Sequence, residues 1–224
     1  RYKNMNKNII KEIQSGLVEG KAQRVKEKVT LALSHGIKPE VILEEGLISP
    51  MNAIGAKFRS GEIFIPTVLM SSRAMHAGLY VLKPVFHQDY KIYKGTIVIG
   101  TVAGDLHDIG KKLVSMMLKS HGYTVIDIGI DVTKEIFVDA VKKYKPNVLA
   151  MSSLLTLTLI EFKCVMEALI ENGLRSEVKV IIGGAPVSVK YAKEIGADAY
   201  ASDAFEAVEA VDDLIYNRIG KFSL

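Results

Sequence analysis

The spacing of apolar residues along the chain changes near residue 90. In residues 1 to about 88, apolar positions recur at helical spacing, and no run alternates as a strand would. Four helices are predicted, at about 6–15, 21–34, 40–58 and 67–84, with Pro50 restarting or kinking the third. This part of the chain is therefore expected to form a small four-helix bundle.

From residue 96 onward, short apolar runs alternate five times with amphipathic segments. We predict strands at 96–102, 123–127, 147–152, 178–182 and 198–201, and helices at 109–121, 134–144, 159–173, 187–195 and 204–217. Short buried strands with helical crossovers indicate a doubly wound, five-stranded parallel sheet of Rossmann type, with a flavodoxin-like strand order. The polar stretch 88–95 is the expected boundary and hinge, between a helical domain at 1–90 and an α/β domain at 91–224.

The segment between the third and fourth predicted helices, 58–66, is unusually apolar for a loop. Burial inside the bundle would account for such side chains, and we expect it for Phe64. For Phe58 and Ile65 the choice between core packing and contact with a ligand stays open.

The first predicted strand leads into a loop that carries Asp105 and His107 between Gly104 and Gly110. A phosphate loop would need four residues between its glycines and then Lys-Ser or Lys-Thr, whereas five residues and Lys-Lys occur here. A dinucleotide fingerprint is excluded because the glycines are not spaced Gly-x-Gly-x-x-Gly. What remains is Asp-x-His-x-x-Gly, and a carboxylate commonly holds the second nitrogen of a metal-ligating histidine. A surface histidine near a helix start would give the same short pattern.

Other distinctive residues follow later strands of the predicted sheet. The run SSLLTLT, 152–158, follows the third strand, Gly183 and Gly184 follow the fourth, and 201–203 follow the fifth. Each could be turn or capping chemistry when taken alone. In doubly wound sheets, however, ligands bind outside the carboxyl ends of the strands, and all these residues fall there. Together they predict a ligand site at that edge.

Composition restricts the classes of function. The 29 basic and 25 acidic residues give a net charge of +4 without a basic block, which argues against a nucleic-acid partner. The single Cys164 excludes a disulfide framework or a thiolate metal cage within one chain and favours a reducing compartment. No apolar run approaches the roughly 20 residues that span a bilayer, and the polar start is not that of a signal peptide. We therefore expect a cytoplasmic protein with no membrane partner.

Three motifs at characteristic spacing carry a family resemblance. Asp-x-His-x-x-Gly at 105–110, Ser-x-Leu at 152–154 and Gly-Gly at 183–184 together resemble the cobalamin-binding family. That family includes the corrinoid domain of methionine synthase and the corrinoid proteins of methanol and methylamine methyltransferase systems. The segment 51–75, MNAIGAKFRSGEIFIPTVLMSSRAM, resembles the helical cap that precedes the corrinoid domain in that family, so the resemblance spans nearly the whole chain. The phrases GAPV, IGADAY and SSLLTLT are most similar to the methylamine group.

The resemblance implies a role for each matching residue. His107 would be the lower axial ligand of cobalt in a cobalamin bound base-off and His-on, with Asp105 holding its second nitrogen and Thr158 as third member of the relay. Gly110 would admit the displaced nucleotide tail of the cofactor, where a side chain would clash. The remaining implied cofactor contacts are Ser152, Leu154, Thr156, Gly183 and Gly184 near that tail, and Phe58 and Ile65 over the upper face of the corrin.

The resemblance also implies a methyl carrier and not an enzyme that acts alone. Its cofactor would be cobalamin, as methylcobalamin or cob(I)alamin, or a related corrinoid. A substrate-specific corrinoid methyltransferase would deliver a methyl group from a methylated amine, a quaternary amine, methanol or a methyl ether. A second methyltransferase would pass it to tetrahydrofolate or coenzyme M, and a reductive activase would be a further partner. A cobalamin-dependent light sensor and an adenosylcobalamin-dependent mutase subunit are the alternatives, and they would need a DNA-binding module and a barrel respectively.

Overall fold

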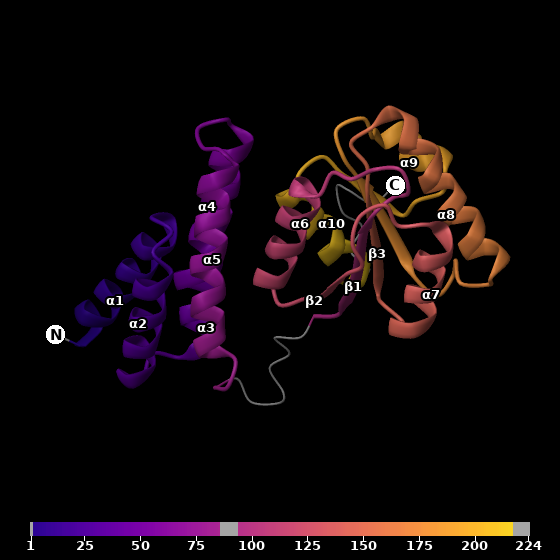
Figure 1. Ribbon diagram of the computed structural model, residues 1–224. Helices are drawn as coiled ribbons and strands as arrows, with labels where there is room; N and C mark the ends of the chain where they lie inside the picture. The colour runs from indigo at the N-terminus through magenta and orange to yellow at the C-terminus, as the bar shows by residue number, and fades with distance from the viewer. Residues whose placement is uncertain (1, 86–93, 217–224) are drawn as a thin grey trace. The chain divides into compact units, whose positions relative to one another are not determined.

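The computed structural model describes residues 2–85 and 94–216, and the chain divides into two compact units, Arg1–Ile92 and Tyr93–Leu224. Each unit is described by itself. The predicted hinge, 88–95, lies almost entirely outside the described residues. The predicted fold class, a helical cap followed by a doubly wound parallel sheet, is confirmed (Figure 1).

The first unit is helical throughout its described part. Its elements are α1 (Tyr2–Val18), α2 (Ala22–Ser34), α3 (Pro39–Val41), the π-helix η1 (Ile42–Ile48), α4 (Ser49–Arg59) and α5 (Ile65–Leu82). Helix α2 packs against both α1 and α5. The apolar positions that set the helical spacing form its core, and they include the fully buried Ile13, Leu17, Val25, Val29, Met75 and Leu82.

The third predicted helix is one helical stretch whose middle is wound as a π-helix. Within η1 the backbone bonds reach five residues back, as the Ser49 N–H does to the Glu44 carbonyl. Pro50 lies in the first turn of α4, directly after the π-helical segment. Ile48 and Ser49 before it already have helical backbone angles, so the helix continues through Pro50 with a change of winding and does not restart there.

The expectation that Phe64 is a core residue is wrong. Phe64 precedes α5, and 72% of its surface is exposed. The neighbouring Val68, one turn into the helix, is fully buried instead. The bundle closes without the loop side chain because α5 itself supplies the apolar face.

The second unit is a five-stranded sheet with every neighbouring pair parallel and the strand order β2-β1-β3-β4-β5. The strands are β1 (Thr96–Thr101), β2 (Thr124–Asp127), β3 (Val148–Ser152), β4 (Lys179–Gly183) and β5 (Ala199–Ala201). Between and after them lie α6 (Ile109–Ser120), α7 (Lys134–Tyr144), the short 3-10 helix η2 (Thr156–Thr158), α8 (Leu159–Glu171), α9 (Val189–Glu194) and α10 (Ala204–Tyr216). This is the flavodoxin-like order that the strand pattern predicted.

Helices cover both faces of the sheet (Figure 1). Val98, Leu149 and Val180 of the three central strands pack in one core cluster with Phe137 of α7 and Phe162 of α8. Successive strand residues point to opposite faces, so the alternate positions face α6 and α10, which pack against each other. Because β1 and β3 are buried on both sides, they read as nearly continuous apolar runs in the sequence, whereas the edge strand β2 is partly exposed.

Candidate functional site

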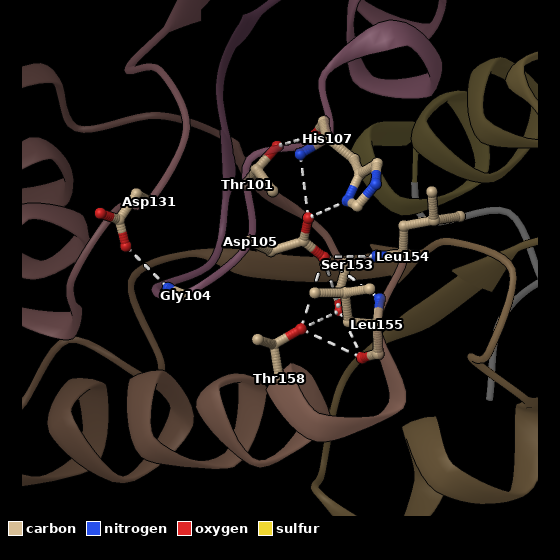
Figure 2. A network of polar contacts seen from close by, with 9 residues as sticks. All are labelled: Thr101, Gly104, Asp105, His107, Asp131, Ser153, Leu154, Leu155 and Thr158. Atoms are coloured by element: carbon tan, nitrogen blue, oxygen red, sulfur yellow. Dashed lines mark hydrogen bonds and ion pairs between the residues drawn. The ribbon is translucent and has the colours of Figure 1, made fainter.

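The loop from β1 to α6 is held in a defined shape by its own backbone and by β1. The Asp105 N–H donates to the Val102 carbonyl at 3.2 Å, and Gly104 takes a φ of +75° that suits glycine. The buried Thr101 hydroxyl donates to the His107 carbonyl at 3.0 Å. The end of β1 and the backbone of His107 are therefore joined directly (Figure 2).

Asp105 is fully buried, and its Oδ1 makes both of its hydrogen bonds with His107. This oxygen accepts the His107 backbone N–H at 2.9 Å and lies 2.7 Å from ring Nδ1. An ionised carboxylate only accepts hydrogen bonds, so Nδ1 carries a proton, and in the neutral imidazole the lone pair is then on Nε2. The predicted carboxylate–imidazole pair is therefore present in the structure.

The second oxygen of Asp105, Oδ2, binds the segment that follows β3. It accepts the backbone N–H groups of Leu154 at 2.6 Å and Leu155 at 3.2 Å. The hydroxyls of Ser153 and Thr158 approach the same oxygen at 3.3 and 3.4 Å. One carboxylate thus ties together the loops after β1 and β3, which are adjacent strands (Figure 2).

Hydrogen bonding keeps Asp105 ionised despite its burial. Burial by itself raises the pKa of this carboxyl group. The backbone N–H groups of His107 and Leu154, the His107 ring and the Leu155 N–H lower it more, and the resulting pKa is well below the ordinary range. A stable negative charge therefore lies beside the imidazole.

The imidazole of His107 is half exposed, with 50% of its side-chain surface accessible. Within residues 2–85 and 94–216, no group of three or more His, Cys, Asp or Glu could enclose a metal ion. A single oriented imidazole with a free Nε2 lone pair instead suits a metal whose other ligands come from a cofactor. The donor set fits a corrinoid, whose ring would supply the other ligands of its cobalt while His107 supplies one.

The relay differs in one member from its predicted form. Thr158 lies near Asp105, as expected, but its hydroxyl is closer to Ser153 Oγ, at 2.8 Å, and to the Leu155 carbonyl, at 3.0 Å. Ser153 is fully buried and was not singled out by the sequence. Ser153 follows the end of β3 and reaches Asp105 because β3 lies beside β1, so no spacing in the sequence marks it.

The predicted glycines differ in what requires them. A Cβ on Gly184, whose φ is +127°, would lie 1.8 Å from the Ser153 carbonyl oxygen, and one on Gly183 would lie 2.8 Å from the Ala201 carbonyl oxygen. The protein's own packing therefore demands both. A Cβ on Gly110 would meet no protein atom within 4 Å, which leaves open space at the start of α6.

The first turn of α6 is fixed by an ion pair that sequence reasoning missed. Lys111 is only 3% exposed, and its ammonium contacts Asp127 Oδ1 at the end of β2. The same oxygen accepts the Gly129 N–H at 2.9 Å. No local pattern marks Lys111 as buried, because its partner lies on another strand.

The other predicted contacts lie at the carboxyl edge of the sheet or in the helical cap. Ser152 ends β3 and pairs with Gly183, while Leu154 and Thr156 are exposed on the following segment. Apolar side chains that were not predicted add to the exposed surface at this edge: Leu106, Ile109, Leu155 and Leu157, between 39% and 88% exposed. In the cap, Phe58 is half-buried and Ile65 is 37% exposed.

Comparison with known proteins agrees with this arrangement. Residues 95–209 match a family model described as a B12 binding domain, and residues 9–83 match a second model of the same description. A dimethylamine corrinoid protein of Methanosarcina barkeri is 41% identical over 92% of this chain and 97% of its own length. A trimethylamine corrinoid protein of the same organism is 39% identical over 91% of this chain and 94% of its own.

Solved structures show the same fold. The methanol:cobalamin methyltransferase complex of Methanosarcina barkeri superposes with a TM-score of 0.77 and 32% identity, over 93% of this chain and 80% of that one. A cobalamin-binding protein of Desulfitobacterium hafniense gives a TM-score of 0.78 and 30% identity, over 92% of this chain and 98% of that one. Within the described residues no helix is long and apolar enough to cross a membrane.

The chain belongs to the cobalamin-binding corrinoid proteins of methyltransferase systems, and its cofactor is cobalamin or a related corrinoid.

Proposed function

We propose that this methyl-carrying corrinoid protein binds its cofactor base-off and His-on, with His107 Nε2 as the lower axial ligand of cobalt. The observation that supports this most directly is the 2.7 Å contact between His107 Nδ1 and the buried Asp105. It holds the ring in one tautomer and raises the basicity of Nε2. When bound, the corrinoid supplies a cobalt ion that accepts and releases a methyl group.

In this proposal Asp105 fixes the position of the proton on the imidazole, and the two hydroxyls near Asp105 fix the position of the carboxylate. While Nε2 is engaged, the proton stays on Nδ1, shared with Asp105 Oδ1. When Nε2 is released, its lone pair becomes free to accept a proton. Ser153 and Thr158 contact the other carboxylate oxygen, Oδ2, so the carboxylate stays in place if the His107 ring moves. A reduction potential that depends neither on pH nor on Asp105→Asn would overturn this proton coupling.

The remaining family positions are proposed as cofactor contacts. Gly110 leaves open space at the start of α6 for the displaced nucleotide tail, and Ser152, Leu154, Thr156, Gly183 and Gly184 belong to the same edge of the sheet. In the helical domain, 1–90, the half-buried Phe58 and the partly exposed Ile65 are the positions proposed to contact the upper face of the corrin. Residues 91–224 then form the domain that holds the cofactor.

The methyl donor proposed is a methylated amine. This rests on relatives at about 40% identity that are named dimethylamine and trimethylamine corrinoid proteins. The chain would exchange its methyl group with a substrate-specific corrinoid methyltransferase and a second methyltransferase that uses tetrahydrofolate or coenzyme M. A reductive activase completes the proposed set of partners. Methylation of the loaded protein should require an amine-specific partner methyltransferase, and methylation by a methanol-specific partner alone would overturn the assignment of the donor.

The axial ligand is tested by reconstitution with hydroxocobalamin and ultraviolet–visible spectroscopy. Wild-type protein should retain one corrinoid per chain with a histidine-ligated spectrum, and His107→Ala should lose that ligation. His35→Ala is the matched control, because His35 is also an exposed histidine but ends α2 in the helical domain. Identical spectra for wild type and His107→Ala would overturn the proposal.

A further inference from the structure

The loop between β2 and α7 continues the pairing with β1. It runs along the loop from β1 to α6, residues 102–108, which carries Asp105 and His107 and is called the ligand loop below. The Thr101 N–H donates to the Gly129 carbonyl at 3.1 Å, and the Val132 N–H donates to the Thr101 carbonyl at 3.0 Å. Val102 and Val132 form an isolated parallel bridge beyond the end of β2. The two loops are thus joined by backbone bonds just before the ligand loop turns away from the sheet.

Within this loop, Asp131 binds the two peptide groups that flank the pair Gly104–Asp105, one on each side. Its Oδ1 accepts the Gly104 N–H at 2.7 Å, and its own N–H donates to the Asp105 carbonyl at 3.1 Å. Figure 2 shows the contact with Gly104, away from the contacts of the Asp105 carboxylate. Asp131 therefore acts on the backbone that carries Asp105 and does not compete for its carboxylate.

The backbone of Asp131 is unusual for a residue with a side chain. Its φ of +53° lies in the left-handed region, and among the described residues Lys145, at +44°, is the other non-glycine with a positive φ. Glycine would adopt this conformation more readily, but it would offer no acceptor to the Gly104 N–H. The carboxylate is therefore what the side chain contributes at this position.

Gly104 is the joint that such an acceptor would need to restrain. With a φ of +75° and no side chain, it is the residue of the ligand loop with the greatest backbone freedom, and it directly precedes Asp105. A rotation at Gly104 would displace the Asp105 carboxylate and, with it, the Nδ1 partner of His107. Because Asp131 binds both the Gly104 N–H and the Asp105 carbonyl, it opposes this rotation. It thereby helps to hold the Asp105 carboxylate beside the His107 ring.

We propose that Asp131 is a positioning residue for the axial ligand: by binding the peptide groups on either side of Gly104 and Asp105, it holds the Asp105 carboxylate where it orients His107. The inference rests on the proposed function, in which His107 ligates cobalt. Asp131 itself needs no contact with the cofactor. Its removal should change the geometry of ligation and leave the fold intact.

Two variants separate the acceptor from the backbone conformation. Asp131→Gly keeps the left-handed conformation and removes the acceptor, whereas Asp131→Asn keeps an acceptor oxygen and is tolerated in that conformation. Lys145→Gly is the matched control, because it changes the other positive-φ residue at the end of α7. Only Asp131→Gly should behave differently from wild type.

The first readout uses protein without a corrinoid. Hydrogen exchange of the Gly104 amide, followed by nuclear magnetic resonance, should be about 10-fold or more faster in Asp131→Gly than in wild type, Asp131→Asn or Lys145→Gly. The second readout is the absorption spectrum after reconstitution with hydroxocobalamin. The ratio of histidine-ligated to unligated corrinoid should fall about 10-fold in Asp131→Gly and recover in Asp131→Asn, as expected for a partner of a metal ligand.

The outcomes distinguish this inference from the proposed function. If His107→Ala changes the spectrum of bound corrinoid but Asp131→Gly does not, the positioning role is overturned and the axial assignment stands. An equal change in Lys145→Gly, or no recovery in Asp131→Asn, also overturns the role of the carboxylate. If His107→Ala leaves the spectrum unchanged, both proposals fail together.

Discussion

Two buried or nearly buried aspartates lie at opposite ends of the same sheet and are satisfied by different partners. At the carboxyl end, Asp105 is surrounded by backbone N–H groups, two hydroxyls and one imidazole. At the amino end, Asp198 precedes β5, and its Oδ2 accepts the Val180 N–H at 2.7 Å and the Arg175 guanidinium at 2.8 Å. Lys179 adds a weaker contact to its other oxygen.

The difference lies in what the partner can bind. The Arg175 guanidinium has donors only, so its pair with Asp198 is a fixed link between the segment before β4 and the residue before β5. The imidazole of His107 is half exposed, and in the proposed function its Nε2 binds cobalt, so the network of Asp105 would respond to events at Nε2. We infer that the amino end of the sheet serves stability and that the carboxyl end couples stability to ligation.

Truncating the two aspartates gives the largest expected contrast. Asp105→Ala leaves the N–H groups of His107, Leu154 and Leu155 without their acceptor, and it should lower the free energy of unfolding by about 3–5 kcal/mol. Asp198→Ala should cost about 1–2 kcal/mol, because the side chain is 17% exposed and water can replace it. Urea unfolding of the protein without a corrinoid measures both, and equal costs would contradict the contrast.

The effect of pH on stability tests the buried charge of Asp105. The pKa of Asp105 is lowered in the folded protein, so the unfolded chain takes up this proton at a higher pH than the folded chain does. The stabilisation is complete above the ordinary aspartate pKa of about 4 and is lost as the pH falls below it. There, wild type should lose up to about 1.4 kcal/mol per pH unit more than Asp105→Asn. Urea unfolding from pH 7 to pH 2.5 tests this, and parallel profiles would argue against it.

Features that depend on residues close together in the sequence could be predicted. Each predicted strand of the sheet overlaps an observed one and differs by a residue or so at its ends. Strands buried on both faces, such as β1 and β3, give apolar runs that are easily recognised. The pairing of Asp105 with His107 was also local, two residues apart. Phe64 misled because an apolar loop residue was assumed to be buried, whereas α5 closes the bundle without it.

What could not be predicted depends on contacts between distant segments. Asp131 acts on Gly104 across 27 residues, and Ser153 reaches Asp105 across 48. Neither residue belongs to a spacing that is visible in the sequence, because their meeting requires β2 and β3 to flank β1. The Asp105–His107 pair can thus be predicted from its motif, while the residues that hold it require the fold.

The hydroxyls beside Asp105 should have a smaller effect than the carboxylate. Thr158→Val removes a buried hydroxyl that contacts Ser153 Oγ at 2.8 Å, and it should lower the free energy of unfolding by about 1 kcal/mol. Thr158→Ser retains the hydroxyl and is the control for the polar contact. Urea unfolding gives the difference between the two variants. A Thr158→Val variant as stable as Thr158→Ser would mean that Ser153 alone satisfies this part of the network.

Gly110→Ala should have the smallest effect on stability and a specific effect on the cofactor. No protein atom lies within 4 Å of the added Cβ, and alanine favours a helix, so the free energy of unfolding should stay constant or rise by up to about 1 kcal/mol. Corrinoid affinity should fall, because the methyl group enters the space proposed for the nucleotide tail. Thermal unfolding without a corrinoid and titration with hydroxocobalamin measure the two effects separately. Unchanged affinity would mean that the space beside Gly110 is not occupied by the cofactor, and the carboxyl end would then couple to ligation through His107 alone.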